Sequence, residues 1–222
     1  MYQFNFQPVF DNLDMLLVGA WLTIQLSFTA MVLGMIVSVA GAVAKTSGIT
    51  VLRLIADVYV EAIRNTPFLV QIFFIFFGLP ALGISMTPNT AALVALVINV
   101  GAYGTEIIRA GIESIPRGQI EAGRALSLSP NRIFVHIILK PTLRNIYPAL
   151  TSQFIYLMLT SSVVSVISAS DLAATGADLN AQTFASFEIY LVLTVMYFLL
   201  SLGFTGLFAV LRRVFFSYPV AR

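Results

Sequence analysis

Five long apolar stretches, separated by shorter polar intervals, limit most strongly how this chain can fold. They cover residues 19–44, 62–82, 90–110, 149–170 and 189–211. A helix that crosses the hydrocarbon core of a bilayer needs about 20 apolar residues, and inside lipid a helix satisfies its own backbone hydrogen-bonding groups. The sequence therefore predicts an all-α membrane protein with five transmembrane helices. No linker or low-complexity segment interrupts residues 1–222, so we expect a single transmembrane domain.

The basic residues fall in only some of the intervals between these stretches. They lie from the end of the first stretch to the start of the second, from the end of the third to the fourth, or after the fifth: Lys45, Arg53, Arg64, Arg109, Arg117, Arg124, Arg132, Lys140, Arg144, Arg212, Arg213 and Arg222. The N-terminal segment and the intervals near residues 79–90 and 169–188 carry acids or no charge. Basic residues are retained on the cytoplasmic side during membrane insertion. This predicts an outside N-terminus, a cytoplasmic C-terminus and a large cytoplasmic loop at residues 111–148.

Composition excludes several classes of function. Charged residues make up 10% of the chain and the net charge is +2, whereas a soluble domain has about 25% charged residues. Neither a water-surrounded fold nor nucleic-acid binding is therefore expected. The chain has no cysteine and one histidine, His136, so Cys-ligated and His-rich metal sites are excluded. Because phosphate-loop and nucleophile motifs are also missing, we expect this chain to have no catalytic residue, metal or cofactor.

The predicted cytoplasmic loop has the pattern of two short helices. Pro116 suits the start of the first helix, which continues through the segment GQIEAGRALSLS from Gly118. Ser129-Pro130 ends this helix and opens a second one, NRIFVHIIL. We expect Lys140-Pro141 to break the second helix before the chain re-enters the membrane. Two such helices below the bilayer are suited to docking against a second protein.

Several short motifs, spread in order over roughly residues 15–215, resemble those of one family. The loop carries Glu121-Ala122-Gly123, then Ser127, then Ile137-Ile138-Leu139-Lys140-Pro141. Other segments contribute Glu61 with Arg64-Asn65-Thr66-Pro67 and Gln71, Glu106 with Arg109-Ala110-Gly111, Asp171-Leu172, and Asn180-Ala181. In this combination the sequence resembles the integral membrane subunits of bacterial ABC importers for polar amino acids, the histidine/glutamine/arginine permease family.

Three loop positions depart from the pattern of that family. Gly123 stands where the family has a second alanine, and Ser127 stands where it has a glycine. Lys140 occupies the usual place of the proline, which here is one residue later. At position 123, a helix with glycine in place of alanine is less stable by about 1 kcal/mol. At position 127, serine is small enough to keep the tight turn that we expect after the first loop helix.

The resemblance implies inward transport of a polar amino acid across the bacterial inner (plasma) membrane by alternating access. The chain would pair with a second identical or homologous permease subunit and receive substrate from an extracytoplasmic amino-acid-binding protein. Two cytoplasmic ATPase subunits would bind ATP. They would contact the loop at the coupling residues Gly118, Glu121, Ala122, Gly123, Ala125, Ser127 and Leu128. Glu121 is the main candidate for polar contact with the ATPase. The alternative is an ion pair with Arg117 or Arg124, worth about 0.2–0.5 kcal/mol.

Polar side chains within the apolar stretches are candidates for the substrate pathway. They are Gln71, Asn99, Tyr103, Glu106, Ser161 and Ser162. Such groups are unfavourable inside a bilayer unless they meet water, substrate or a partner. The alternatives are interhelical hydrogen bonds for Asn99 and Tyr103, an ion pair with Arg109 for Glu106, and hydrogen bonds to their own helix for the serines.

Two other classes of protein compete with the importer interpretation. A secondary transporter or channel would not need a basic docking loop of this form, and internal inverted repeats, which many such transporters have, are not found. A membrane-embedded enzyme would need the nucleophile or metal-ligand motifs that this sequence lacks.

Overall fold

The computed structural model describes residues 4–216, and within this range every regular element is helical. The α-helices are α1 Gln7–Phe10, α2 Leu13–Thr46, α3 Thr50–Arg64, α4 Phe68–Phe73, α5 Pro88–Glu113, α6 Arg117–Ala125, α7 Pro130–Arg132, α8 Lys140–Thr160, α9 Leu172–Thr183 and α10 Ser186–Phe215. The π-helices η1 Phe74–Gly78 and η3 Ile133–Leu139, and the 3-10 helices η2 Leu79–Leu82 and η4 Ser161–Ile167, continue or join them. Arg222 lies outside the described residues.

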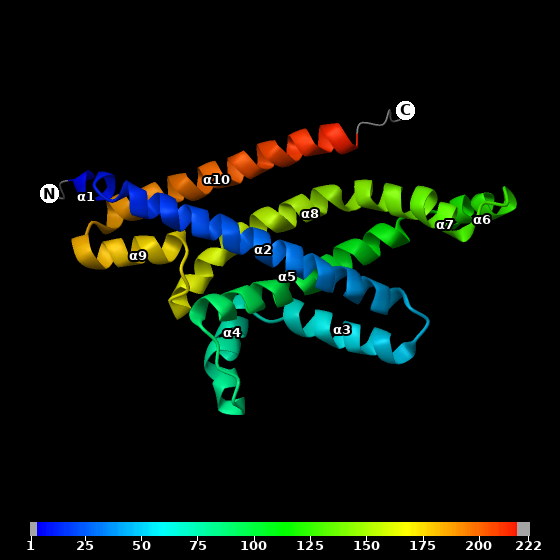
Figure 1. The fold of residues 1–222 in the computed structure, drawn as a ribbon, viewed down its shortest axis with the longest axis horizontal. Coiled ribbons are helices and arrows are strands. Elements are labelled where there is room, and N and C mark those ends of the chain that lie inside the picture. The colour runs from blue at the N-terminus through cyan, green and yellow to red at the C-terminus, as the bar shows by residue number, and fades with distance from the viewer. Residues whose placement is uncertain (1–3, 217–222) are drawn as a thin grey trace.

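Helices α2, α5, α8 and α10 run along the long axis of the molecule (Figure 1). Helices α6 and α7 lie beyond one end of these long helices, which we call the loop end, and α1 and α9 lie toward the opposite end. Four helical segments are long and apolar enough to cross a membrane, and the bent pair Thr50–Arg64 and Phe68–Leu82 gives a fifth span if it counts as one. The predicted all-α membrane fold is confirmed.

Small residues bring α2 and α5 into close contact. A Cβ atom on Gly104 of α5 would collide with the Oγ atom of Ser38 on α2, so an alanine does not fit without rearrangement. The Ser38 hydroxyl donates to the carbonyl oxygens of Gly34 and Val100, at 2.7 and 3.2 Å. Helices in lipid pack through such small residues because no hydrophobic effect drives them together. The contact fixes the position of the last turns of α5 beside the end of α2.

The second apolar stretch is not the continuous helix that we expected over residues 62–82. Helix α3 ends at Arg64, and α4 begins at Phe68 after a bend of 107°. Pro67 has an extended backbone, with φ −63° and ψ 137°, and precedes the first residue of α4. A proline disfavours helical conformation at the residue before it, so the first helix ends there. The chain from α4 onward then projects away from the long helices (Figure 1).

The predicted break at Lys140-Pro141 is wrong. The π-helix η3 leads directly into α8, and both Leu139 and Lys140 have helical backbone conformations. A proline ring inside an α-helix collides with the carbonyl group four residues earlier. The wider turn of a π-helix shifts that carbonyl group, which accounts for the uninterrupted helix at Pro141.

A buried aspartate organises the opposite end of the bundle. The Asp171 carboxylate accepts a hydrogen bond from the backbone N–H of Ala174 at 2.7 Å and thereby caps α9. The hydroxyl of Tyr197 on α10 donates to the same carboxylate at 3.3 Å, and the Leu172 N–H donates to Thr23 on α2 at 3.0 Å. Burial raises the pKa of Asp171 to about 6, although hydrogen bonds to the carboxylate from the backbone N–H of Ala174 and from the Tyr197 hydroxyl act to lower it.

We expect Asp171 to make the stability of the protein depend on pH between about 4 and 6. The unfolded chain releases this proton near its ordinary pKa of 3.8 while the folded protein holds it up to about 6. The free energy of unfolding should therefore fall as pH rises through this interval, by about 2–3 kcal/mol. Asp171→Asn keeps a capping side chain and lacks the titration. Thermal unfolding midpoints of the two proteins, measured from pH 4 to 7, should diverge; parallel curves would contradict this prediction.

Candidate functional site

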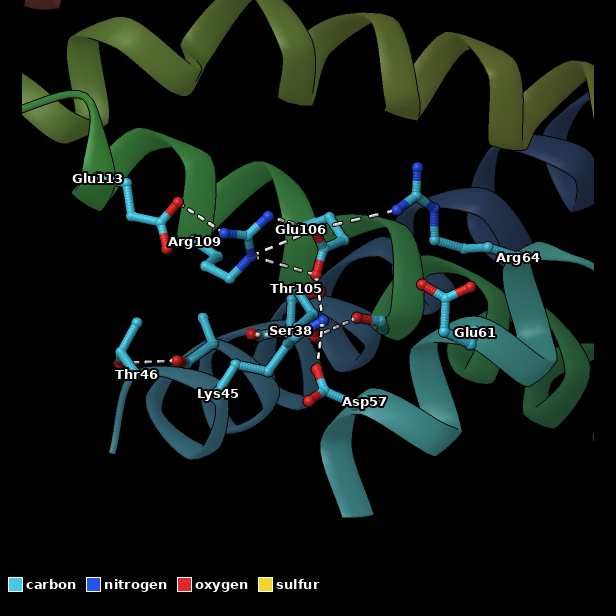
Figure 2. A network of polar contacts seen from close by, with 12 residues as sticks. Ser38, Lys45, Thr46, Asp57, Glu61, Arg64, Thr105, Glu106, Arg109 and Glu113 are labelled. Carbon is cyan, nitrogen blue, oxygen red and sulfur yellow. Dashed lines mark hydrogen bonds and ion pairs between the residues drawn. The ribbon is translucent and has the colours of Figure 1, made fainter. Parts of the chain in front are cut away.

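Charged side chains from three helices meet near the loop end of the bundle (Figure 2). Glu106 of α5 lies at the centre, 2.6 Å from the Lys45 ammonium group of α2 and 2.8 Å from the Arg109 guanidinium group. Arg64 at the end of α3 approaches the same carboxylate at 4.0 Å. The predicted pairing of Glu106 with Arg109 is therefore present, and it is part of a larger cluster.

Two further acids complete this cluster. Asp57 of α3 pairs with Lys45 at 2.8 Å, and Glu113 pairs with Arg109 at 2.6 Å. Glu61 of α3 stays outside the cluster and accepts a hydrogen bond from the Asn65 side chain at 2.6 Å. Removing one member of a shielded ion pair leaves the other charge uncompensated. The cluster thus ties α2, α3 and α5 together.

A hollow of about 610 Å³ opens beside this cluster between α3, α5 and α8. Its polar lining consists of Arg64, Tyr103, Glu106, Ser114 and Asn145. The Arg64 guanidinium group lies 5.4 Å from the centre of the Tyr103 ring, within the range of a favourable cation–π contact. Of the predicted pathway residues, the structure brings Tyr103 and Glu106 together at this hollow.

Gln71 and Asn99 do not line this hollow and instead form hydrogen bonds at the bend between α3 and α4. The Gln71 amide nitrogen donates to the carbonyl oxygens of Ile63 and Thr66, at 2.7 and 3.0 Å. These carbonyl groups stand where α3 ends, and backbone groups released by a broken helix must find partners inside a membrane. Asn99 of α5 donates to the Gln71 side chain at 3.4 Å, and only 6% of Asn99 is exposed. The two amides therefore brace the bend between α3 and α4.

The candidate serines hydrogen-bond to their own helix. Ser161 donates to the Met158 carbonyl oxygen at 2.8 Å, and Ser162 donates to that of Leu159 at 2.7 Å. Neither residue lines the hollow between α3, α5 and α8. This arrangement is the alternative that the sequence offered for both side chains.

The loop presents most of its predicted coupling residues on the surface. Gly118, Glu121, Ala122, Ala125 and Ser127 are exposed, and Leu128 is half-buried. No basic side chain among residues 4–216 lies within ion-pair distance of Glu121, so the alternative, an ion pair with Arg117 or Arg124, is not formed.

Gly123 is the buried member of this set and joins α6 to η3. A Cβ atom at this position would lie 2.6 Å from the terminal methyl carbon of Ile137, so glycine lets Ile137 rest on the α6 backbone. Ser127 has φ 55°, a left-handed conformation that favours glycine. The first observation explains the glycine at position 123. The second shows that Ser127 adopts a conformation to which glycine, the residue that the family has here, is better suited.

Three contributors to these sites were missed from the sequence. Lys45 and Asp57 join the charged cluster through contacts between helices, which spacing along the chain does not reveal. Leu126 follows α6 and is 75% exposed. The signal in the sequence was a leucine at the end of a helix that was predicted to dock against another protein. Within the described part of the chain, no group of three His, Cys, Asp or Glu side chains could hold a metal ion.

Comparison with known proteins identifies the family. Residues 30–215 match the family described as binding-protein-dependent transport system inner membrane component. The L-cystine transport system permease protein TcyB of Bacillus subtilis (strain 168) is 36% identical over 82% of this chain and 75% of its own length. The glutamine transport system permease protein GlnP of Escherichia coli (strain K12) is 33% identical over 95% of this chain and 97% of its own. The chain belongs to this family of inner membrane transport components.

Solved structures agree with that assignment. A crystal structure of an amino acid ABC transporter with histidines superposes with a TM-score of 0.89 at 34% identity, over 96% of this chain and 99% of the other. An inward-facing MetNI methionine ABC transporter has a TM-score of 0.69 at 20% identity, over 89% of this chain and 96% of the other, a likeness of fold alone. The protein is thus a multi-pass permease subunit of an ABC importer, and a partner ATPase hydrolyses ATP. The predictions of family, of a transport subunit rather than an enzyme, and of ATP bound by a partner are confirmed.

We expect Glu106→Gln to destabilise the folded protein by about 2–3 kcal/mol, because Lys45 and Arg109 lose their shared negative charge. The matched control is Glu113→Gln, which removes a more exposed carboxylate that pairs with Arg109 alone and should cost less than about 1 kcal/mol. Thermal unfolding of the detergent-purified complexes compares the two. Equal losses would show that Glu106 does not hold the cluster together.

Proposed function

We propose that this permease carries a polar amino acid from an extracytoplasmic binding protein into the cytoplasm. The observation that supports this most strongly is similarity over nearly the full length to a glutamine permease, together with the close structural match to an amino acid ABC transporter. The named relatives move cystine or glutamine. A small zwitterion with a polar side chain is the ligand that these examples share.

The distribution of charge supports a cytoplasmic location for the loop end. Most described basic residues belong to the C-terminal parts of α2, α5 and α10 or to the segment from α6 to the start of α8. The exposed acids Asp11, Asp14 and Asp178 belong to the end of α1, the first turn of α2 and α9, at the opposite end of the bundle (Figure 1). Basic residues remain on the cytoplasmic side during insertion. The N-terminus is therefore outside, and α6 stands where a cytoplasmic ATPase can reach it.

Helix α6 is the part of the chain that contacts the ATPase. Glu121 offers a carboxylate without a basic partner among the described residues, and Leu126 offers an exposed apolar side chain. Buried apolar anchors with polar neighbours provide most of the binding energy in protein interfaces. Two permease subunits and two ATPase subunits in one complex would supply one such contact for each permease.

The hollow beside Tyr103 forms part of the pathway for the substrate. Glu106 is already neutralised by Lys45 and Arg109, so it does not attract a cation. Arg64 has a side chain that is 41% exposed and lies 4.0 Å from its nearest acidic oxygen. A guanidinium group so placed is suited to the α-carboxylate of an amino acid.

Uptake into proteoliposomes tests the transport function. The permease is purified with its ATPase, reconstituted, and supplied with ATP inside, the binding protein outside, and radiolabelled glutamine, cystine or histidine. Uptake of at least one of these amino acids should require both ATP and the binding protein. Transport that continues without ATP would identify a secondary transporter, and the proposal would fail.

We expect Glu121→Arg to reduce co-purification of the ATPase and ATP-driven uptake at least tenfold, because the reversed charge faces the docking surface. The control is Asp178→Arg, the same charge change on an exposed residue of α9 at the opposite end of the bundle. This variant should retain the ATPase. Equal retention of the ATPase by both variants would remove Glu121 from the contact.

A further inference from the structure

A basic groove separates the start of α8 from the end of α10 at the loop end of the bundle. We use this name for a hollow of about 370 Å³ lined by Lys140, Pro141, Leu143, Arg144, Asn145, Phe215 and Phe216. Lys140 and Arg144 lie four residues apart on α8, a spacing that puts both side chains on one face of the helix. The groove thus presents two cations beside aromatic rings.

Contacts between α8 and α10 hold the groove in shape. The Tyr147 hydroxyl of α8 donates to the Phe208 carbonyl oxygen of α10 at 2.8 Å. The Tyr147 ring packs against the ring of Phe216 with 5.1 Å between centroids. The end of α10 is therefore fixed against α8, and a ligand would meet a preformed site.

Among residues 4–216, the cations of the basic groove have no acidic partners. Helix α8 contains no aspartate or glutamate, and the acid of α10, Glu188, is near the opposite end of that helix. Across residues 4–216 no acidic side chain is within ion-pair distance of Lys140, Arg144 or Arg212. In the cluster around Glu106, by contrast, Lys45 and Arg109 are both paired. The charge of the groove is left for an external anion.

Apolar surface continues from the groove along the two helices. Arg212 lines an adjoining hollow of about 210 Å³. Its other lining residues are the apolar Pro148, Ile155, Phe208 and Ala209 and the hydroxyl-bearing Tyr147, Thr151, Ser152 and Thr205. Phe215 is 66% exposed at the end of α10. A ligand that fits both parts needs a negatively charged head at the membrane boundary and an apolar tail that follows α8 toward the membrane interior.

We propose that the basic groove binds one anionic phospholipid, with its headgroup phosphate between Lys140 and Arg144 and an acyl chain along α8 and α10. Basic pockets between membrane helices on the cytoplasmic side attract anionic headgroups. An acidic surface of the ATPase would satisfy the cations but would leave Phe215 and the adjoining hollow uncovered, so the lipid fits better. The orientation proposed above enters only in assigning this lipid to the cytoplasmic leaflet.

Native mass spectrometry of the detergent-purified permease–ATPase complex tests the site. Phosphatidylglycerol and phosphatidylcholine are titrated separately into the wild type, into K140Q/R144Q, and into R53Q/R132Q. The last variant is the matched control, because it removes two exposed cations that do not line the groove. Wild type and control should each retain phosphatidylglycerol in preference to phosphatidylcholine. K140Q/R144Q should bind phosphatidylglycerol about 30-fold more weakly.

Several results would overturn the proposal. Equal phosphatidylglycerol binding by all three proteins would remove the site, as would equal binding of the two lipids by the wild type. Displacement of phosphatidylglycerol by millimolar inorganic phosphate would show a phosphate site rather than a lipid site. Loss of the ATPase from K140Q/R144Q with lipid binding unchanged would show an ATPase contact. Because the measurement does not depend on transport, it can fail or succeed independently of the importer function.

Discussion

The cost of placing an unpaired charge in lipid determines much of this structure. A charged side chain at the centre of a bilayer costs between about 2.5 and more than 10 kcal/mol. The chain responds in two ways. Lys45 and Arg109, which reach into the bundle, share the Glu106 carboxylate, while Lys140 and Arg144 line the basic groove, where the proposed lipid headgroup would meet them. Pairing inside the bundle also joins α2, α3 and α5 near the loop end.

Ion pairs hold α2, α3 and α5 together next to the loop of residues 111–148, so a movement of the loop would act on a rigid group of helices. Helix α6 rests on η3 through Gly123, and η3 continues without a break into α8. Helix α8 and the cluster helix α5 together line the hollow beside Tyr103. We infer that a displacement of α6 by the ATPase would be carried along α8 to the wall of that hollow. Arg64, which ends α3 just before the bend that Gln71 and Asn99 brace, lines the same hollow.

The sequence predicted the features that depend on local patterns. Length and hydropathy predicted the membrane helices, and a spacing of three residues predicted the pair between Glu106 and Arg109. Contacts between helices could not be read from spacing, so the roles of Lys45 and Gln71 were missed. The continuous helix expected over residues 62–82 and the break expected at Lys140-Pro141 both failed at a proline. Pro67 ends a helix that the surrounding apolar run concealed, whereas Pro141 is tolerated because a π-helix precedes it.

Access to Leu126 tests most directly the central claim, that the basic loop end faces the cytoplasm and is covered by an ATPase. The chain has no cysteine, so Leu126→Cys introduces a single thiol at an exposed position. A membrane-impermeant maleimide should label this thiol in inside-out vesicles stripped of the ATPase, and re-added ATPase should protect it. Labelling in sealed right-side-out vesicles, or labelling that the ATPase does not reduce, would contradict the account.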